Sequence, residues 1–427
     1  MGRIESTAPG SPRHGRDNAP GCVRSTARFL DGAVNFNLSE EQALLRDAVE
    51  RFADQRYDVP QRALSRASPA GYSGENWAEL AGLGLLALPF DPEYGGLGGG
   101  PIELATVMEA LGRALAVEPV LEEIVIAGGL LAAAGNAEQR QRWLPAMIEG
   151  SGHLALAHVE RQARFALPDV ETTASSNGSA ATLTGLKSFV PAGAGADAYL
   201  VSARRAGEQG PAAIRFYLVA ADAAGVERRS FRLVDGSVAV QLMLRDAPGE
   251  PLEGGIECLT EVAERAQIAA GAEMLGLMSR LFDSTLEHVR NRRQFGAPLA
   301  SFQVIQHRMV DLYVSLELSR SQLYRAALST ADGERPRAVA GMKSYLSAAA
   351  VSMGEQCIHL HGAMGTTDEL AVGHAHKRIL VLATLFGDAD HELRRFIELA
   401  DAAGPVGPGC AAVPPTLDRG ASQSPRP

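Results

Sequence analysis

The apolar residues of this chain change their spacing twice, and this change constrains the fold more than any other feature. In residues 34–152 they recur at helical intervals, as Leu45 and Val49 do. Residues 153–254 contain short apolar runs between turn residues, which is the pattern of β-strands. Helical spacing returns in long stretches through residues 255–402. The order predicts a helical domain, a small middle β domain and a second helical domain.

Turn and capping residues divide these three parts into individual elements. The first helix is expected to begin at Ser39, which can form a capping box with Gln42. Further helices are expected at 75–83, 102–115, 120–134, 137–149, 256–292, 302–329, 335–361 and 376–402. Strands are expected at 170–174, 181–190, 199–203, 214–220 and 238–244. The sequence has no internal repeat and no glycine-rich strand-to-helix fingerprint of a doubly wound dinucleotide-binding sheet.

Composition excludes several classes of protein. A chain of 427 residues is long enough for two or three packed domains. Its 40 basic and 50 acidic residues give a net charge of −10. A negative net charge does not favour binding to nucleic acid or to an anionic membrane. The longest apolar stretches are too short to span a bilayer. The four cysteines show neither metal-site spacing nor a dense disulfide pattern, so we expect a reduced, cytoplasmic setting.

The two ends of the chain differ in composition from the rest. Residues 1–33 mix Gly, Pro, Ser, Arg and Asp, without the apolar run of a secretory signal. Residues 403–427 are rich in Pro, Gly and Ser. Both segments are expected to be disordered, because such sequences cannot bury enough apolar surface.

The most specific segment, RRQFGAPLASFQVIQ at 292–306, ends one long predicted helix and begins the next. A guanidinium at a helix end can form forked hydrogen bonds to a pyrophosphate, or it can be a solvated cation favoured there by the helix dipole. With the order of domains, this segment resembles the acyl-CoA dehydrogenase family over residues 36–402. The resemblance implies a middle β-barrel or β-sandwich, a C-terminal four-helix bundle and FAD contacts across a subunit interface. It assigns these contacts to Arg292, Gln294, Phe295, Phe302 and Gln303.

Three further segments resemble FAD-contacting parts of the family. These are ALAHVER at 155–161, GLKSFVP at 185–191 and HLHGAMGTTDE at 359–369. The resemblance implies FAD contacts from Leu156, His158, Val159, Phe189, Val190, His359, Gly362, Ala363 and Asp388. Pro191 replaces a residue that usually bears a hydroxyl, and Ala363 replaces a usual glycine, which is harmless only if its φ is negative. The paired histidines at 359/361 and 374/376 lack further ligands at fixed spacing, so we predict no metal site.

The catalytic base is the position where this sequence departs most from the family. Removal of a proton from an acyl thioester needs a positioned carboxylate, whose pKa is raised by burial. By resemblance the base would align with Phe386 in one large branch and with Ala266 in another. Asp388 and Glu264 are the nearest acids and are the candidate bases. Asp388 could instead cap the last helix or contact a ribose, Glu264 could be a solvated helix residue, and a partner subunit could supply the base.

The stretches GGLGGG at 95–100, LAVEPV at 115–120 and DELAVGH at 368–374 are most similar to the branch that contains the pimeloyl-CoA dehydrogenase small subunits. It implies FAD-dependent α,β-dehydrogenation of an acyl-CoA thioester, with flavin N5 as hydride acceptor and an electron-transfer flavoprotein as electron acceptor. It also implies a homodimer, a homotetramer or a heteromer with a second acyl-CoA dehydrogenase subunit. Two alternatives remain open, a non-catalytic partner subunit and a flavin oxidase on the same fold. We expect a disordered extension at 1–33, an N-terminal helical domain at 34–152 and a middle β domain at 153–254. A C-terminal helical bundle is expected at 255–402 and a disordered tail at 403–427.

Overall fold

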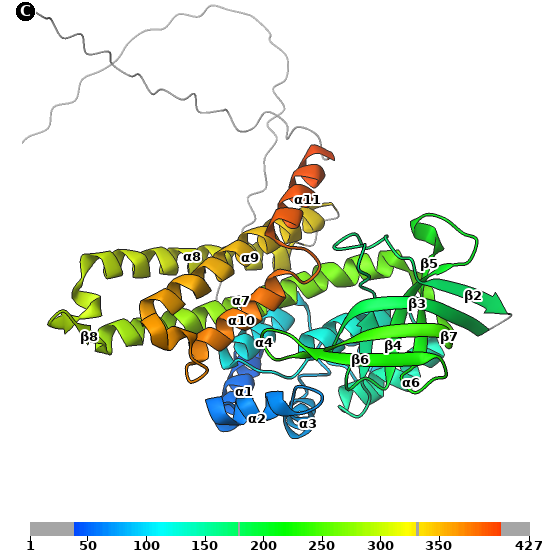
Figure 1. Cartoon of the computed structure of the whole chain (residues 1–427), viewed down its shortest axis with the longest axis horizontal. Coiled ribbons are helices and arrows are strands. Elements are labelled where there is room, and N and C mark those ends of the chain that lie inside the picture. The colour runs from blue at the N-terminus through cyan, green and yellow to red at the C-terminus, as the bar shows by residue number, and fades with distance from the viewer. Residues whose placement is uncertain (1–37, 178–179, 330–332, 403–427) are drawn as a thin grey trace, which may run out of the picture. The chain divides into compact units, whose positions relative to one another are not determined.

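The computed structural model describes residues 38–177, 180–329 and 333–402, so the predicted extension and tail lie outside the described residues. The first helical part contains α1 (Glu40–Arg56), α2 (Val59–Ala67), α3 (Gly74–Gly82), η1 (Pro92–Tyr94), α4 (Pro101–Ala114), the π-helix η2 (Val120–Gly128), α5 (Gly129–Ala134) and α6 (Ala137–Ile148). The strands are β1 (Leu154–Ala157), β2 (Thr173–Asn177), β3 (Ala180–Pro191), β4 (Ala198–Arg205), β5 (Ile214–Ala220), β6 (Val226–Arg232) and β7 (Val238–Gly255), with η3 (Pro211–Ala213) before β5. The last part contains α7 (Ile256–Asn291), β8 (Arg293–Gln294), β9 (Ala297–Pro298), η4 (Leu299–Ser301), α8 (Gln303–Leu328), α9 (Glu334–His361), η5 (Gly362–Thr366), α10 (Ala371–Ala383) and α11 (Ala389–Ala402). The predicted order of helices, strands and helices is therefore confirmed (Figure 1).

The seven strands β1 to β7 form one mixed sheet whose pairings close on themselves. β4 pairs with β2, β2 with β3, β3 with β7, β7 with β5, and β5 with β4 again. β1 adds to β4, and β6 adds to β7. Alternate residues of β1 pack into different apolar clusters. Ala155 packs into the cluster inside the β-strands, whereas Leu154 and Leu156 pack into the cluster that the helices share. This alternation places one face of β1 against the helices, where the site lies.

Close approach of α4 and α7 joins the first helical part to the last. A Cβ on Gly112 would lie 2.1 Å from the carbonyl oxygen of Glu273, and one on Gly276 would lie 1.9 Å from that of Glu109. Only glycine fits at both crossings, because any side chain would push the two backbones apart. α7 is thereby buried along most of its length and serves as the central helix of the fold.

Three parts of the predicted secondary structure need correction. The helix expected at 376–402 is broken, because Phe386 and Gly387 have φ values of 55° and 131° and Asp388 caps a new helix, α11. The strand β6 was not predicted, since its residues are almost all exposed and show no apolar alternation. The short helix α2 was also missed, although Asp58 accepts a hydrogen bond from the N–H of Gln61 and Pro60 lies in the first turn.

Candidate functional site

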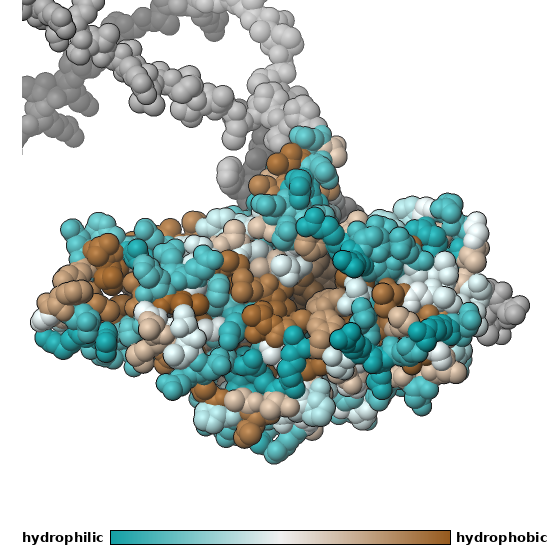
Figure 2. Space-filling model, in the orientation of Figure 1, coloured by the Kyte–Doolittle hydropathy of each residue, from teal (hydrophilic) through white to brown (hydrophobic). Residues whose placement is uncertain are grey.

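A cavity of about 460 Å³ lies where the β-strands meet the helices. Its walls come from α2, the segment before η2, the β1–β2 loop, the end of β3, the β6–β7 turn and the end of α10 with the loop after it. In Figure 2 brown, apolar side chains gather in a hollow between the helices around α10 and the strands. The volume is that of a pocket for a ligand of cofactor or drug size.

One wall of the cavity is apolar and contains predicted FAD-contacting residues from two strands. Leu156, Val159 and Phe189 line it together with Phe386. Val159 and Phe189 form an isolated β-bridge, so the β1–β2 loop is fixed against β3. The structure thus brings the predicted residues of these two segments together, except Val190, which is fully buried inside the β domain.

The other wall is charged and centres on Arg378 of α10. Its guanidinium donates to Glu273 at 2.7 and 3.1 Å, to Glu122 at 3.1 Å and to Asp235 at 3.4 Å. The side chain of Arg378 is 13% exposed, and its three partners are 3–10% exposed. Burial raises the pKa of Glu273, against the opposing effect of Arg378. This cluster joins η2, the β6–β7 turn, α7 and α10 beside the cavity.

Two more guanidinium groups line this charged wall. Arg62, which is 6% exposed, donates from Nε to the carbonyl oxygen of Leu115 at 3.0 Å. Burial, then repulsion from Arg66, lowers the pKa of Arg62 to about 10. The residues that line the cavity include four arginines, Arg62, Arg66, Arg164 and Arg378, and two carboxylates, Glu122 and Asp235, so positive charge is in excess. The sequence alone does not predict this charged wall, because its ion pairs join residues that are far apart in the chain.

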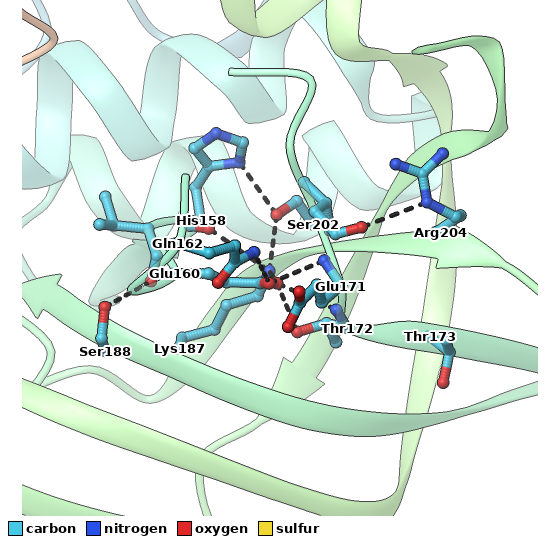
Figure 3. Close-up of polar contacts among 12 residues, drawn as sticks. His158, Glu160, Gln162, Glu171, Thr172, Thr173, Lys187, Ser188, Ser202 and Arg204 are labelled. Atoms are coloured by element: carbon cyan, nitrogen blue, oxygen red, sulfur yellow. Dashed lines mark hydrogen bonds and ion pairs between the residues drawn. The ribbon is translucent and has the colours of Figure 1, made fainter. Parts of the chain in front are cut away.

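The loop after β1 is held by a buried carboxylate (Figure 3). Glu160 accepts from Lys187 Nζ at 2.7 Å, from Thr172 Oγ1 at 2.7 Å, and from the N–H groups of Glu171 and Thr172 at 2.7 and 3.1 Å. Burial alone would raise the pKa of Glu160, but the Lys187 ammonium and these hydrogen bonds lower it to about 2. Burial also lowers the pKa of Lys187, to about 8, so the pair is charged at neutral pH. The sequence signal that could have predicted this pair is a lysine inside the strand predicted at 181–190, which needs a counter-ion if it is buried.

Replacing Glu160 by Gln is expected to lower the free energy of unfolding by roughly 3–5 kcal/mol, because the change leaves the fully buried Lys187 ammonium without its counter-ion. The pKa of Glu160 is lower in the folded state than its ordinary value of 4.5. The ionised carboxylate therefore makes its full contribution to the stability of the fold above pH 4.5, and this contribution is lost as the pH falls towards 2. Urea unfolding at pH 7.5 and at low pH measures both effects. The difference from the unchanged protein should shrink in acid.

The matched control is Asp283→Asn, which breaks the exposed pair between Arg113 and Asp283 at 2.8 Å. Both side chains are about half exposed, and such pairs contribute roughly 0–1 kcal/mol. Equal losses in the two variants would contradict the role given to burial.

The predicted glycine-rich turn forms η5 at the end of α9. Gly362 has a φ of 64° and open space on the side where a Cβ would lie, so it needs the glycine and leaves its backbone accessible. Ala363 is exposed and is not among the described residues with positive φ, so its methyl group causes no strain. His359 is exposed and contacts Arg308 through Nδ1 at 3.1 Å.

The Arg292 segment lies at the opposite end of α7 from the strands (Figure 1). Glu273 of α7, which contacts Arg378 beside the cavity, lies 19 residues before Arg292, so this segment is roughly 28 Å along the helix from the charged wall of the cavity. Phe295 is 90% exposed and contacts Phe302 edge-to-face at 6.2 Å. Arg292, Gln294 and Gln303 are exposed, and their side chains have no hydrogen bond within 38–177, 180–329 and 333–402. They are free to contact a second molecule.

The structure does not bring either candidate base into the cavity. Asp388 caps α11, where Oδ1 accepts from the N–H of His391 at 2.8 Å. Glu264 of α7 pairs with Arg395 at 2.9 Å and with Arg335 at 3.9 Å. Neither residue lines the cavity. In this structure both carboxylates therefore have structural contacts, and the cap of α11 matches the alternative given for Asp388.

The described part of the chain contains neither a metal-binding group of side chains nor a membrane-spanning helix. Within it, no group of three or more His, Cys, Asp or Glu side chains is arranged to hold a metal ion. None of its helices is long and apolar enough to cross a membrane.

The described residues thus form a helical part, a closed β-sheet part and a second helical part, with an apolar cavity where they meet. Residues 39–151 match the N-terminal domain of acyl-CoA dehydrogenases, and residues 253–398 match their C-terminal domain. The chain belongs to the acyl-CoA dehydrogenase family, whose members use FAD and are oxidoreductases.

Named relatives and solved structures agree with this assignment. The cyclohexane-1-carbonyl-CoA dehydrogenase of Geobacter metallireducens is 30% identical over 79% of this chain and 91% of that protein. The mitochondrial isovaleryl-CoA dehydrogenase of Pongo abelii is 27% identical over 86% of this chain and 90% of that protein. A chain of the ChsE4–ChsE5 complex of Mycobacterium tuberculosis superposes with a TM-score of 0.78 and 26% identity, over 87% of this chain and 100% of that one.

The residues present fit FAD in two places. The cavity offers an apolar wall with Phe189 for a flat ring, and the backbone around His158 for polar ring edges. The exposed guanidinium, amides and aromatic ring of the Arg292 segment have the chemistry to bind a diphosphate and a nucleoside. The second place lies apart from the cavity, 19 residues along α7 from the contact between Glu273 and Arg378.

Proposed function

We propose that this chain takes part in FAD-dependent α,β-dehydrogenation of an acyl-CoA thioester, with the flavin N5 as hydride acceptor and an electron-transfer flavoprotein as the next electron acceptor. The observation that supports this function most is the apolar cavity between β1, β3 and α10, in a chain that belongs to the acyl-CoA dehydrogenase family. FAD supplies the two-electron oxidant of the reaction when it is bound.

In this proposal the chain's own residues bind the ligand and exclude water from it. Leu156, Val159, Phe189 and Phe386 exclude water from the reacting part of the ligand. Glu160 and Lys187 fix the loop that carries His158 and Val159. No carboxylate of the described residues lines the cavity without an ion-pair partner, because Glu122 and Asp235 both contact Arg378.

An oligomer is part of this proposal. Besides the Arg292 segment, α8 carries exposed apolar residues at helical spacing, namely Val310, Val314 and Leu318, which are 49–60% exposed. Exposed apolar stripes of this kind are typical of protein interfaces. We propose a homodimer, a homotetramer, or a heteromer with a second acyl-CoA dehydrogenase chain.

A second candidate function is favoured by one specific observation, the phenyl ring of Phe386 in the cavity wall. This ring occupies the position where the resemblance puts a glutamate base. The chain would then be a partner subunit that contributes FAD contacts and interface surface, while another chain removes the proton. The positions of Asp388 and Glu264 outside the cavity support this alternative.

Anaerobic addition of acyl-CoA esters to the chain, purified alone and then with co-expressed dehydrogenase chains, distinguishes the candidates. A self-sufficient dehydrogenase is expected to be yellow and to lose its flavin absorbance on mixing. We expect loss of absorbance only with a second chain present, because the cavity has no unpaired carboxylate. Rapid oxygen uptake would instead identify a flavin oxidase. Absence of both flavin binding and bleaching in every combination would contradict the proposed function.

A further inference from the structure

A chain of buried polar groups ends on His158 at the cavity (Figure 3). Lys187 Nζ donates to Glu160 at 2.7 Å, to Ser202 Oγ at 2.9 Å and to the carbonyl oxygen of His158 at 3.4 Å. Ser202 Oγ also lies 2.9 Å from Nδ1 of His158. Lys187 and Ser202 are fully buried and His158 is 5% exposed, so water does not compete for these bonds.

The order of donors in this chain determines the tautomer of His158. An ammonium is only a donor, so Ser202 Oγ accepts from Lys187. The contacts of Ser202 Oγ within the described residues are Lys187 and Nδ1 of His158, so the hydroxyl hydrogen is satisfied only if it is donated to Nδ1. Nδ1 is then an acceptor without hydrogen, and the ring's hydrogen lies on Nε2.

The second ring nitrogen of His158 points away from the network in Figure 3. No described residue forms a hydrogen bond with Nε2, and His158 is among the residues that line the cavity. We propose that the Lys187–Ser202 pair holds His158 in the Nε2–H tautomer, so that it donates a hydrogen bond to an acceptor atom of the ligand in this cavity. The acceptor is a ring carbonyl or nitrogen of the flavin, or the thioester carbonyl.

The charge around His158 supports a neutral donor. Burial, and then the positive charge of Lys187, lowers the pKa of His158 to about 3, with Glu160 opposing this effect. Lys187 and Glu160 are the charged groups that act on the ring. The imidazole therefore does not gain a second hydrogen near neutral pH, and its role is to donate a hydrogen bond rather than to exchange a proton with the ligand.

The tautomer can be tested without any assumption about the reaction. In the full-length protein with ¹⁵N-labelled histidine, His158, assigned by comparison with His158→Gln, should show an unprotonated Nδ1 and a protonated Nε2 from pH 6 to 8. Ser202→Ala removes the donor to Nδ1 and should produce a second tautomer or a titrating ring. Ser188→Ala, which removes a hydroxyl that contacts the carbonyl oxygen of Val159, is the control and should leave the tautomer unchanged. A protonated Nδ1 in the unchanged protein would overturn the proposal.

The ligand that receives the hydrogen bond is tested with His158→Gln and His158→Leu. A glutamine amide can retain a donor near the position of Nε2, whereas leucine removes it. Removal of the donor should weaken binding of the accepting ligand about tenfold, the size expected for one buried hydrogen bond, and glutamine should restore most of this loss. A weaker FAD complex with a shifted flavin spectrum identifies the flavin. An unchanged spectrum with weaker acyl-CoA binding identifies the thioester.

This second test rests on the proposed function, and its failure is distinguishable from failure of that function. If both variants bind FAD and acyl-CoA as the unchanged protein does, His158 is not a donor to the ligand, although the function stands. If the unchanged protein binds neither ligand, alone or with a second chain, the proposed function fails while the tautomer test still applies.

Discussion

Replacing Arg378 by Gln is expected to remove most of the stability of the folded chain. The change leaves three buried carboxylates, those of Glu122, Asp235 and Glu273, without the guanidinium that they share. Loss of one partner of a buried ion pair costs roughly 3–5 kcal/mol, and here three partners lose it at once. A loss of about 5 kcal/mol or more would approach the total stability of an ordinary domain. Unfolding in urea measures it.

The loss should depend on pH in a definite direction. Burial raises the pKa of Glu273 even in the presence of Arg378, and removal of the guanidinium takes away an opposing effect. The folded variant will therefore bind protons at a higher pH than the unfolded chain does, so its free energy of unfolding should increase as the pH falls from 8 to 5. The unchanged protein should show a smaller gain, because Arg378 opposes the effect of burial on the pKa of Glu273.

A compensating variant keeps the prediction testable if the single variant does not fold. Arg378→Gln combined with Glu122→Gln, Asp235→Asn and Glu273→Gln removes all the buried charge and should recover most of the lost stability, because a neutral polar cluster can bond internally. Arg320→Gln is the control, since its pair with Glu109 is 24–30% exposed. A compensating variant no more stable than the single one would contradict the electrostatic argument.

The sequence predicted the fold where the spacing of apolar residues is regular. The long helix α7 follows from helical apolar spacing, and β4 follows from a short run of mostly apolar residues that are buried on both faces of the sheet. β6 could not be predicted in this way because its stability comes from pairing with β7, which leaves its side chains exposed. The break between α10 and α11 depends on two residues of positive φ, of which only Gly387 is a glycine.

The site was predictable only where local segments form it. The segment from Leu156 to Val159 and Phe189 do meet at the cavity wall. The charged wall depends on Arg378 and Glu122, which are 256 residues apart, and one sequence does not show that they meet. Asp388 is a different case, because its carboxylate caps α11 and this local contact competes with the chemical role predicted for it.

The vacant base position leads to the prediction with the largest expected change in activity. Phe386→Glu places a carboxylate in the apolar cavity wall, where its pKa should be raised towards neutrality and its strength as a base should increase. The backbone there has a φ of 55°, which Phe386 already adopts, so the change adds no new backbone requirement. If the missing carboxylate alone limits the isolated chain, anaerobic bleaching of its flavin by acyl-CoA should become roughly 10²–10⁴ times faster, the usual contribution of a general base.

The control for this prediction is Phe386→Gln, which has nearly the same size as the glutamate variant but cannot accept the proton. Bleaching should be fast in the glutamate variant, slow in the glutamine variant, and should increase with pH through the pKa of the new carboxyl, because only the ionised form is a base. Both variants must first be shown to contain equal amounts of bound FAD by their visible absorbance. Equal rates in two yellow variants would mean that the absence of a carboxylate at this position does not limit the reaction. The partner-subunit proposal would then need a reason other than the phenyl ring.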